Sequence, residues 1–428
     1  MNRKTVSGIM LTMLLISMLT LTFNIQPVEA DWTWTETIYI MADGSVEPPT
    51  APISSIDNVT YTFTDNIVGD VPEETSAITV EKDNIVVDGG GYTLQGGGGA
   101  YGTRGIDLSG RKNVTVQNTQ IHGLFYGLWL GSAPRHNIIR QNNITDNSYG
   151  IYLGSARHNS ISGNTLAANR YYGINVDISS YYNSISGNTI EDNEYGIYLR
   201  QSFNSSISGN IIAANEGYGI RLSGFMTMYS SYNTISGNTI VNGGTGILIS
   251  GQCSSNTFYH NNFINNTQHA DFDTAYYRSN FWDDGYPSGG NHWDNCSSSD
   301  LYLGPGQNIT GSDGVADEPY IINDKNRDNY PLMEPWTPTP SIPTTIDELK
   351  TEIEELGSED KIDNQGIVRS LIAKLDVAQK LIDDGKIDQA KNILEAFINE
   401  VQAQSGKHIT PDAAGLLIES AEYILSHL

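Results

Sequence analysis

The stretch Asn159-Ser-Ile-Ser-Gly-Asn-Thr-Leu-Ala-Ala-Asn-Arg-Tyr-Tyr-Gly-Ile-Asn-Val176 contains the two motifs whose repetition decides the fold. The first, Asn-Ser-Ile-Ser-Gly-Asn, returns three times with little change, at Asn183–Asn188, Ser205–Asn210 and Asn233–Asn238. The second, Tyr-Gly followed by alternating apolar residues, begins every 23 residues, at Tyr126, Tyr149, Tyr172, Tyr195 and Tyr218. A repeat of about 22 to 24 residues is typical of a solenoid.

The spacing inside each repeat indicates strands rather than helices. Ile174 and Val176 lie two positions apart with Asn175 between them, which is the alternation of a β-strand. Each repeat has room for about three short strands, broken at Asn and Gly, whereas a propeller blade needs about 40 residues. The sequence therefore predicts an all-β right-handed parallel β-helix with coils about 4.8 Å apart. Ile and Leu should fill the interior, and Asn should form side-chain amide ladders at the corners.

The pattern Asn-x-Ile-x-x-Asn-x-Ile-x-x-Asn with a following Gly-Ile-x-Leu resembles the NosD-like family of parallel β-helix repeats. These repeats are also described as carbohydrate-binding and sugar-hydrolysis domains. The flanking segments Asn84–Leu94 and Trp282–Asn291 are similar to those of secreted archaeal members, and the resemblance spans roughly residues 33 to 334. It implies a pectate-lyase-like solenoid and an association with copper. It does not imply one activity, because β-helices carry many unrelated functions.

The N-terminus has the pattern of a secretory signal peptide. Arg3 and Lys4 precede an apolar run from Gly8 to Phe23, and Ala30 ends a small-x-small cleavage site. A membrane anchor is the alternative, but the apolar run is short for a span. We therefore expect a secreted or cell-surface protein that begins at Asp31 and has no membrane span after cleavage.

The composition changes abruptly after Trp336, where a Pro/Thr-rich segment precedes residues with helical spacing such as Leu371 and Leu375. Thr410-Pro411 is a good N-cap and first helical position. The segment Ala396–Gly406 resembles the helical FIMAH module of secreted proteins. The expected regions are a signal peptide (1–30), an N-terminal cap with the first strands (31–75), β-helix repeats (76–270), an acidic Gly/Asp-rich cap (271–336), a linker (337–345) and a helical FIMAH-like module (346–428).

The net charge of −26 excludes several kinds of partner. Nucleic acid and anionic lipid both require basic surface, so we expect neither to bind. The same acidity argues against an acidic polysaccharide unless cations bridge the two. Cys253 and Cys296 are the two cysteines, and in an exported chain a disulfide is the expected state. Seven Asn-x-Ser/Thr sequons suit a glycoprotein: Asn58, Asn113, Asn143, Asn204, Asn265, Asn295 and Asn308.

Strand alternation predicts one outward column on the strand that follows each Tyr-Gly pair. Flat aromatic rings can lie against a pyranose while amide and guanidinium groups bind its hydroxyls. The alternative is that these side chains only stack on one another for stability. The Tyr-Gly tyrosines recur in every repeat, so we interpret them as structural. The predicted carbohydrate-binding residues are Trp129, Tyr152, Asn175, Tyr198 and Arg221.

No catalytic residues are predicted. Asp177, Arg200 and Arg221 are a lyase-like grouping on neighbouring coils, but a cross-strand ion pair explains Asp177 and Arg200 equally well. A glycosidase needs two carboxylates a fixed distance apart, and the repeats present mostly Ser, Thr and Asn instead.

No cofactor is required, but the acidic cap suits calcium, which prefers several oxygen ligands in one loop. A solvated acidic surface is the alternative. The copper that the resemblance implies has few candidate ligands, namely His136, His158, Met226 and Met228. The predicted calcium ligands are Asp313, Asp317, Asp324, Asn326 and Asp328.

These observations favour a non-catalytic extracellular β-helix that presents a lateral face to a polysaccharide or a surface glycoprotein. A polysaccharide lyase or glycoside hydrolase is the second interpretation. A structural envelope protein without a ligand is the third.

Overall fold

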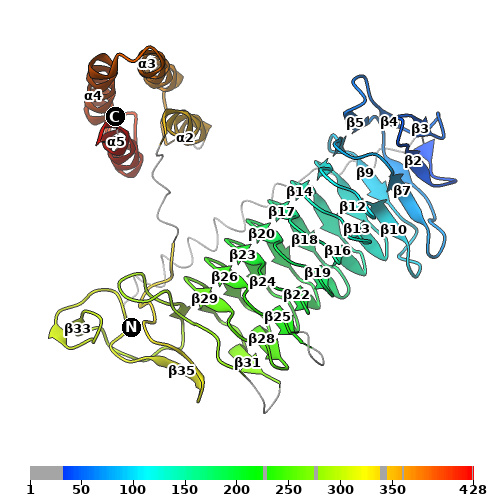
Figure 1. The fold of residues 1–428 in the computed structure, drawn as a ribbon, viewed down its shortest axis with the longest axis horizontal. Coiled ribbons are helices and arrows are strands. Elements are labelled where there is room, and N and C mark those ends of the chain that lie inside the picture. Colours follow the sequence, from blue (N-terminus) through cyan, green and yellow to red (C-terminus); the bar gives the residue numbers. More distant parts are fainter. Residues whose placement is uncertain (1–31, 225–228, 274–277, 338–344, 359–360, 427) are drawn as a thin grey trace. The chain divides into compact units, whose positions relative to one another are not determined.

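The computed structural model describes residues 32–224, 229–273, 278–337, 345–358, 361–426 and 428. The predicted signal peptide and most of the predicted linker lie outside these residues. The chain forms two compact units, 1–336 and 337–428 (Figure 1). Each unit is described by itself below.

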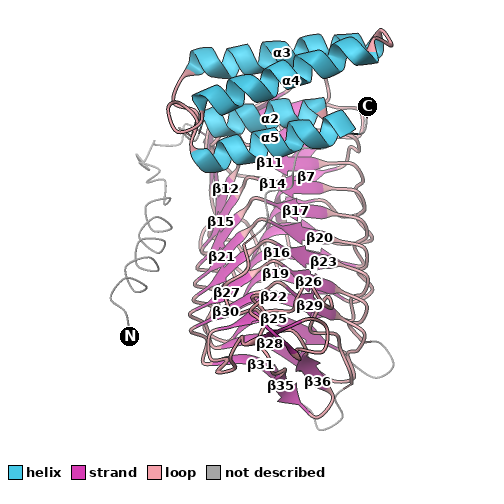
Figure 2. Cartoon of the chain, turned by 90° about the vertical axis from the view of Figure 1, so that its left-hand side faces the viewer, coloured by secondary structure: helices cyan, strands magenta, loops and turns pink. Residues whose placement is uncertain are grey.

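The first unit is a parallel β-helix, as the repeat predicts. Each coil contributes one strand to each of three sheets, which we name A, B and C, and Figure 2 shows these strands stacked coil upon coil. Within the described residues, sheets A and B have 11 strands each and sheet C has 10.

In order across sheet A, the strands are β1 (Trp32–Thr33), β6 (Ile67–Val68), β9 (Thr93–Gln95), β12 (Gln120–His122), β15 (Asn143–Thr145), β18 (Thr165–Ala167), β21 (Thr189–Glu191), β24 (Ile211–Ala213), β27 (Thr239–Val241), β30 (Asn262–Ile264) and β32 (His292–Trp293). Those of sheet B are β3 (Val46–Glu47), β2 (Ile38–Ile40), β7 (Ser76–Val80), β10 (Arg104–Asp107), β13 (Tyr126–Leu130), β16 (Tyr149–Gly154), β19 (Tyr172–Asp177), β22 (Tyr195–Arg200), β25 (Tyr218–Ser223), β28 (Thr245–Ser250) and β31 (Gln268–Phe272). Those of sheet C are β29 (Thr257–Tyr259), β26 (Thr234–Ser236), β23 (Ser206–Ser208), β20 (Ser184–Ser186), β17 (Ser160–Ser162), β14 (Ile138–Arg140), β11 (Thr115–Gln117), β8 (Val86–Asp88), β5 (Thr60–Phe63) and β4 (Ile53–Ser54).

The β-helix extends beyond the repeats 76–270 at both ends. At the N-terminal end, β1 pairs in parallel with β6, and β2 with β7. At the C-terminal end, β32 still pairs in parallel with β30. The cap that follows contains two antiparallel hairpins, β33 (Tyr302–Leu303) with β34 (Ile309–Thr310) and β35 (Tyr320–Asn323) with β36 (Asn326–Asp328).

The register places identical residue types above one another. On sheet B, Ile151, Ile174 and Ile197 are paired on successive strands, and all three are fully buried. These columns of Ile and Leu fill the interior as predicted. Because burying each such side chain contributes about 1.5 to 3 kcal/mol, the stacked core is the main stabilising feature of the coils.

Three ladders of buried Asn run along the corners, which confirms the predicted amide ladders. In each ladder, the backbone N–H and the side-chain amide of one Asn donate to the side-chain oxygen of the Asn one coil further on, as Asn164 does to Asn188. The first ladder runs through Asn137, Asn159 and Asn183, then Ser205, and on through Asn233, Asn256 and Asn280. The second runs through Asn142, Asn164, Asn188, Asn210, Asn238, Asn261 and Asn291, and the third through Asn147, Asn169, Asn193 and Asn215.

The glycine of each Tyr-Gly pair faces the interior where adjacent coils approach closely. A Cβ atom built on Gly173 would lie 2.7 Å from Ile190 Cγ2 and 2.9 Å from the Gly196 carbonyl oxygen. Equivalent clashes occur at Gly150 and Gly219. This column therefore requires glycine because no side chain fits, and the Tyr-Gly repeat has a structural cause.

The second unit is helical, as predicted, and its described residues form α2 (Ile346–Ser358), α3 (Gln365–Asp383), α4 (Ile387–Gln404) and α5 (Pro411–Ser426). The residues with helical spacing form its core, including Leu371, Leu375 and Phe397. The last helix begins at Pro411, where the sequence predicts its first turn.

Cys253 and Cys296 are not joined, contrary to the expected disulfide. Cys253 is fully buried with its Sγ 3.2 Å from the Ser250 carbonyl oxygen, whereas Cys296 is half-buried. Burial raises the pKa of the Cys253 thiol to about 12, so this residue is a core side chain rather than a nucleophile. Within the part of the chain that the structure describes, no helix combines the length and the apolarity that a membrane span requires.

Candidate functional site

The outer face of sheet B carries the predicted carbohydrate-binding residues. Trp129, Tyr152, Asn175, Tyr198 and Arg221 are register partners on five consecutive strands. The apolar residues on either side of each of them point into the core, so the five form one column on the outside. The predicted geometry of the column is therefore confirmed, while its ligand remains a prediction.

The stacking of the aromatic rings differs from what a sugar platform requires. Trp129 and Tyr152 stack on each other, with ring centroids 4.2 Å apart and planes 9° apart. The guanidinium of Arg104 lies 4.6 Å from the Trp129 ring on this face. Parallel strands bring side chains into face-to-face contact along the coil axis, so these rings stack on protein neighbours. Tyr152 and Arg104 cover the two faces of the Trp129 ring, so Trp129 would meet a sugar mainly by its edge. Sugar binding by this column remains a prediction.

Two buried polar atoms on this face have no partner. Asn175 is only 7% exposed, and its Oδ1 accepts no hydrogen bond. The Arg104 Nε also lacks an acceptor. Only two other buried side-chain polar atoms in the described residues share this property, on His269 and Gln307. An unpaired buried polar group costs about 1 to 3 kcal/mol. Both atoms are buried from solvent, so a ligand could satisfy them only if neighbouring side chains moved aside.

Sequence reasoning missed Arg104. The segment Arg104-Gly-Ile-Asp-Leu108 matches the Tyr-Gly-Ile-x-Leu motif in every position except the first. Arg104 is the register partner of Tyr126 and therefore continues the tyrosine column, and Asp107 is the partner of Trp129. Strand alternation already placed Asp107 in the outward column, whereas Arg104 takes the position of the tyrosines that were interpreted as structural, so nothing singled it out.

The charged residues of the face form separate ion pairs. Arg104 pairs with Asp107 at 2.9 Å, and Arg200 pairs with Asp177 at 3.4 Å. Arg221 pairs instead with Asp273, at 3.6 Å. The lyase-like grouping of Asp177, Arg200 and Arg221 is therefore divided between two ion pairs, because Arg221 contacts the C-terminal coils.

The five tyrosines of the Tyr-Gly motif stack continuously, with successive ring centroids 5.0 to 5.5 Å apart. Burial raises the pKa of Tyr126 to about 12 and also raises the pKa of Tyr172. On the neighbouring column, burial and then the charge of Asp177 raise the pKa of Tyr152. Phenols in this state remain protonated at neutral pH, so these tyrosines are poor candidates for the base of a lyase.

The five predicted calcium ligands are not gathered into one cluster. Asp313 accepts hydrogen bonds from the backbone of Gly304 and Val315, while Asp317 accepts from Leu301 and Tyr302. Asp324 is exposed in the hairpin turn. Asn326 and Asp328 are buried at the ends of Asn ladders. Within the described residues, no group of three or more His, Cys, Asp or Glu side chains has the arrangement of a metal site. Calcium binding by this cap remains a prediction. Because Asn326 and Asp328 face inward, other residues of the cap would have to supply ligands in their place.

Asp328 ends the second Asn ladder. Its Oδ2 accepts from the Asn291 backbone N–H at 2.7 Å and from Trp293 Nε1 at 2.9 Å. Its Oδ1 accepts from the Tyr330 backbone N–H at 3.1 Å. Burial raises the pKa of Asp328 to about 7, in opposition to these hydrogen bonds, which lower it.

The raised pKa of Asp328 makes folding depend on pH. Between the unfolded pKa of about 3.9 and the folded value of about 7, the folded state retains a proton that the unfolded state loses. Stability should therefore fall as the pH rises from 4 to 7, by on the order of 2 to 4 kcal/mol. Asp328→Asn should remove this decline, which denaturant unfolding at pH 5 and pH 8 would measure. Glu318→Gln, the same charge change at an exposed residue, should retain it, and an equal decline in both variants would contradict the assignment to Asp328.

The copper implied by the resemblance does not fit the described residues. His136 and His158 stack with ring centroids 5.2 Å apart and planes 9° apart. Within the described residues, no Cys, Asp, Glu or further His forms a metal-binding group with them. Met226 and Met228 lie outside the described residues. No copper chemistry is therefore assigned to this chain.

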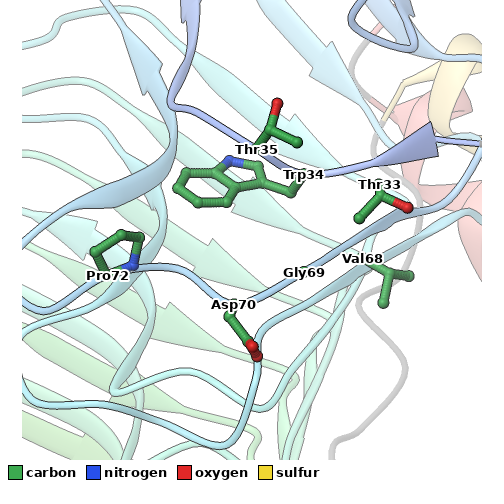
Figure 3. Close-up of a pocket in the computed structure, with 7 residues that line it drawn as sticks. All are labelled: Thr33, Trp34, Thr35, Val68, Gly69, Asp70 and Pro72. Carbon is green, nitrogen blue, oxygen red and sulfur yellow. The ribbon is translucent and has the colours of Figure 1, made fainter.

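An open pocket of about 730 Å³ lies at the N-terminal end of the β-helix, between the first coils (Figure 3). Trp34 forms one wall, and Asp70 is the one ionisable side chain in its lining. The Trp34 indole N–H donates to the Ala77 carbonyl oxygen at 3.1 Å, so it is engaged in the fold. A single carboxylate beside a structural tryptophan is no catalytic arrangement.

Comparison with solved structures finds several other β-helices. The A-module of a mannuronan C-5 epimerase from Azotobacter vinelandii is 18% identical, with a TM-score of 0.41 over 51% of this chain and 62% of that one. An alginate lyase from Paenibacillus is 15% identical, with a TM-score of 0.40 over 50% of this chain and 80% of that one. The Dettilon tailspike protein is 16% identical, with a TM-score of 0.37 over 61% of this chain and 57% of that one. The chain thus spans less than two thirds of two of these three proteins, and similarity at this level says nothing about its activity.

A search of curated proteins finds no match. Comparison with protein-family models finds two. Residues 346–426 match the FIMAH domain, which confirms the resemblance of the helical unit. Residues 66–298, more than half of the chain, match the family described as "Periplasmic copper-binding protein (NosD)". With its repeats, its stacked coils and this match in agreement, the protein belongs to the NosD family and carries a C-terminal FIMAH domain.

Proposed function

We propose that this protein is an exported, non-catalytic β-helix whose sheet B binds a glycan through its outer face. The observation that carries the proposal is the outward column on sheet B, in which the buried Asn175 Oδ1 between Tyr152 and Tyr198 has no protein donor. A ligand reaches this atom when a neighbouring side chain moves aside. Asn175 Oδ1 can accept a hydrogen bond, and a carbohydrate hydroxyl can donate one to it. Export is supported by the signal-peptide pattern of residues 1–30 and by the periplasmic description of the family.

The surroundings of Asn175 suit a polar, uncharged ligand. The ion pairs Arg104–Asp107, Asp177–Arg200 and Arg221–Asp273 leave the face close to neutral while supplying many donors and acceptors. The Tyr152 hydroxyl donates to Asp177 Oδ2 at 3.1 Å, which fixes the ring beside Asn175. Rigid polar groups of this kind bind hydroxyls with little loss of side-chain entropy.

The same observations favour binding over catalysis. Each Arg on the face is held by a carboxylate, and the tyrosine pKa values rise rather than fall. Asp107 and Asp177 are three coils apart, about 14 Å at the usual strand spacing, which exceeds the separation of a glycosidase pair. A lyase or hydrolase therefore has no residue on this face that is poised for proton transfer.

The test uses Asn175→Leu, which keeps a similar volume and removes the unpartnered oxygen. We expect binding to fall by about tenfold or more while the melting temperature holds or rises, because a buried unpaired acceptor is lost. If Asn175 were purely structural, Asn175→Leu would lower the melting temperature and leave binding unchanged. The measurement is a neutral and acidic glycan array, followed by titration calorimetry on the glycans that bind.

Thr79→Val is the matched control, since Thr79 lies in the same outward column two coils before Trp129. It should leave binding unchanged. A wild-type protein that binds no glycan would support a structural envelope protein instead. Release of unsaturated products or new reducing ends would support an enzyme.

A further inference from the structure

The charges of the β-helix are not evenly distributed. Residues 108–176 contain one acidic residue, Asp146, in a chain whose net charge is −26. The same stretch contains six basic residues, which gives 6 − 1 = +5. These are Arg111, Lys112, Arg135, Arg140, Arg157 and Arg170. Three successive coils of a strongly acidic protein are therefore positively charged.

The basic residues concentrate on the turn that connects sheet B to sheet C. Lys112, Arg135 and Arg157 are bridged in parallel on consecutive coils, so their side chains form one column. The next two positions of that column are Tyr181 and Phe203. We call the surface formed by Lys112, Arg135, His136, Arg157 and His158 the basic corner.

The arginines of the basic corner are not neutralised. Arg135 and Arg157 are both exposed, and neither forms an ion pair with any described carboxylate. Asp83 lies near the edge of the corner, 4.0 Å from Lys112. On sheet B, by contrast, every Arg of the outer face has an Asp partner. Unpaired surface cations on a rigid scaffold create a positive potential that attracts anions.

Aromatic residues fix the shape of the basic corner. The His136, His158 and Tyr182 rings stack with centroids 5.2 and 5.0 Å apart and planes within 10°. The Arg157 guanidinium lies 4.3 Å from the Tyr181 ring. The corner therefore presents a ridge of ring edges beside the guanidinium groups of Arg135 and Arg157, the second of which is held against Tyr181.

We propose that the basic corner binds an anionic polysaccharide, whose carboxylate or sulfate groups pair with Arg135 and Arg157. Guanidinium groups bind both kinds of anion in a planar, two-pronged geometry. The coil spacing of about 4.8 Å is close to the length of one sugar unit, so consecutive coils can meet consecutive residues of the polymer. This surface differs from the outer face of sheet B, and the proposal does not rest on the proposed function.

The stacking argues for a polysaccharide over a single-stranded nucleic acid. Proteins that bind single strands stack bases on open aromatic faces. Neighbours on adjacent coils cover both ring faces of His158 in the basic corner and of Tyr181 beside it, so no base can insert at either ring. Ring edges and histidine nitrogens can still bind hydroxyls and carboxylates.

The proposal revises the expectation that the overall acidity excludes acidic polysaccharides. Charges are screened over about 8 to 10 Å at physiological salt, so acidic residues on remote coils have little effect at the corner. The net charge describes the whole chain, while a polymer a few sugars long meets only the local surface.

The experiment measures binding of the full chain to polygalacturonate, heparin, neutral dextran and oligo-dT by biolayer interferometry at two salt concentrations. We expect binding to polygalacturonate or heparin that weakens with salt, and none to dextran. Arg135→Gln with Arg157→Gln should weaken it by about tenfold or more. Arg135→Lys with Arg157→Lys should recover part of the affinity, which separates charge from folding. Polygalacturonate distinguishes carboxylate recognition from the sulfate recognition of heparin.

Arg278→Gln with Arg327→Gln is the matched control, because it removes two exposed charges elsewhere on the β-helix unit. It should bind like the wild type. The proposal is overturned if the wild type binds neither polygalacturonate nor heparin, or if it binds oligo-dT more tightly than both. It is also overturned if the control variant and the Arg135→Gln, Arg157→Gln variant lose affinity equally. Loss of binding in Asn175→Leu with none in the corner variant would likewise overturn it while leaving the proposed function intact.

Discussion

Asn188→Ala should lower the free energy of unfolding by about 3 to 5 kcal/mol. Asn188 donates to the carbonyl oxygens of Ile161 and Ser186 and to Asn210 Oδ1, at 2.9 to 3.1 Å. It also accepts from the backbone and side-chain N–H groups of Asn164 at 3.0 and 2.9 Å. Alanine would leave these buried groups without partners, and each costs about 1 to 3 kcal/mol. Denaturant unfolding followed by circular dichroism measures the loss.

Ser186→Ala is the control for this prediction, since Ser186 is in the same coil and points outward. It should change stability by less than about 0.5 kcal/mol. Asn188→Asp adds a sharper comparison, because it can accept from Asn164 but cannot donate to Ile161. If Asn188→Asp were as stable as the wild type, acceptance alone would explain the ladder and the donor role assigned to Asn188 would be wrong.

Gly173→Ala should lower the free energy of unfolding by about 3 kcal/mol, because the added methyl group has no space between the coils. The new Cβ would meet Ile190 Cγ2 at 2.7 Å and the Gly196 carbonyl oxygen at 2.9 Å. Neither atom can move freely, because one belongs to the packed core and the other to the backbone of the next coil. The coils would have to separate locally, which also weakens the strand pairing of β19 with β22. Thermal and denaturant unfolding give the measurement.

Gly187→Asn is the control for the glycine prediction. Gly187 has a φ of +62° but nothing within 4 Å of its built Cβ. The equivalent positions of other coils hold Asn118 and Gln141, with φ values of 53° and 55°. Asn should therefore be tolerated at Gly187, with a cost below about 1 kcal/mol. If Gly187→Asn lost as much stability as Gly173→Ala, the explanation by lack of space at Gly173 would be contradicted, since the built Cβ of Gly187 meets nothing within 4 Å.

These interior features also support the candidate binding surfaces. The Asn ladders and the glycine column hold successive coils in one register, which keeps Trp129, Tyr152 and Asn175 in line on sheet B. The same register aligns Arg135 with Arg157 on the basic corner. A substitution that shifts the coils should therefore weaken both surfaces, even though it touches neither.

The sequence alone predicted the coil, the interior columns, the Asn ladders and the helical unit. It could do so because parallel stacking repeats one local rule: apolar residues two apart point inward, and Asn occupies each corner. Residues one repeat apart therefore had to become neighbours, as Tyr149 and Tyr172 did. The column on sheet B followed from the same rule.

The tertiary structure decided how those neighbours use their groups, because ring stacking and ion pairing depend on side-chain directions that the repeat does not encode. It stacked Trp129 on Tyr152, paired Arg200 and Arg221 with different carboxylates, and buried Asp328 at the end of a ladder. The sequence had left open a sugar platform, a lyase-like grouping and a calcium ligand at these residues. It left Asn175 Oδ1 without a partner and gathered Arg135 and Arg157 on one corner. The repeat sets which residues are adjacent, and the packing around each one sets which remain available to a ligand.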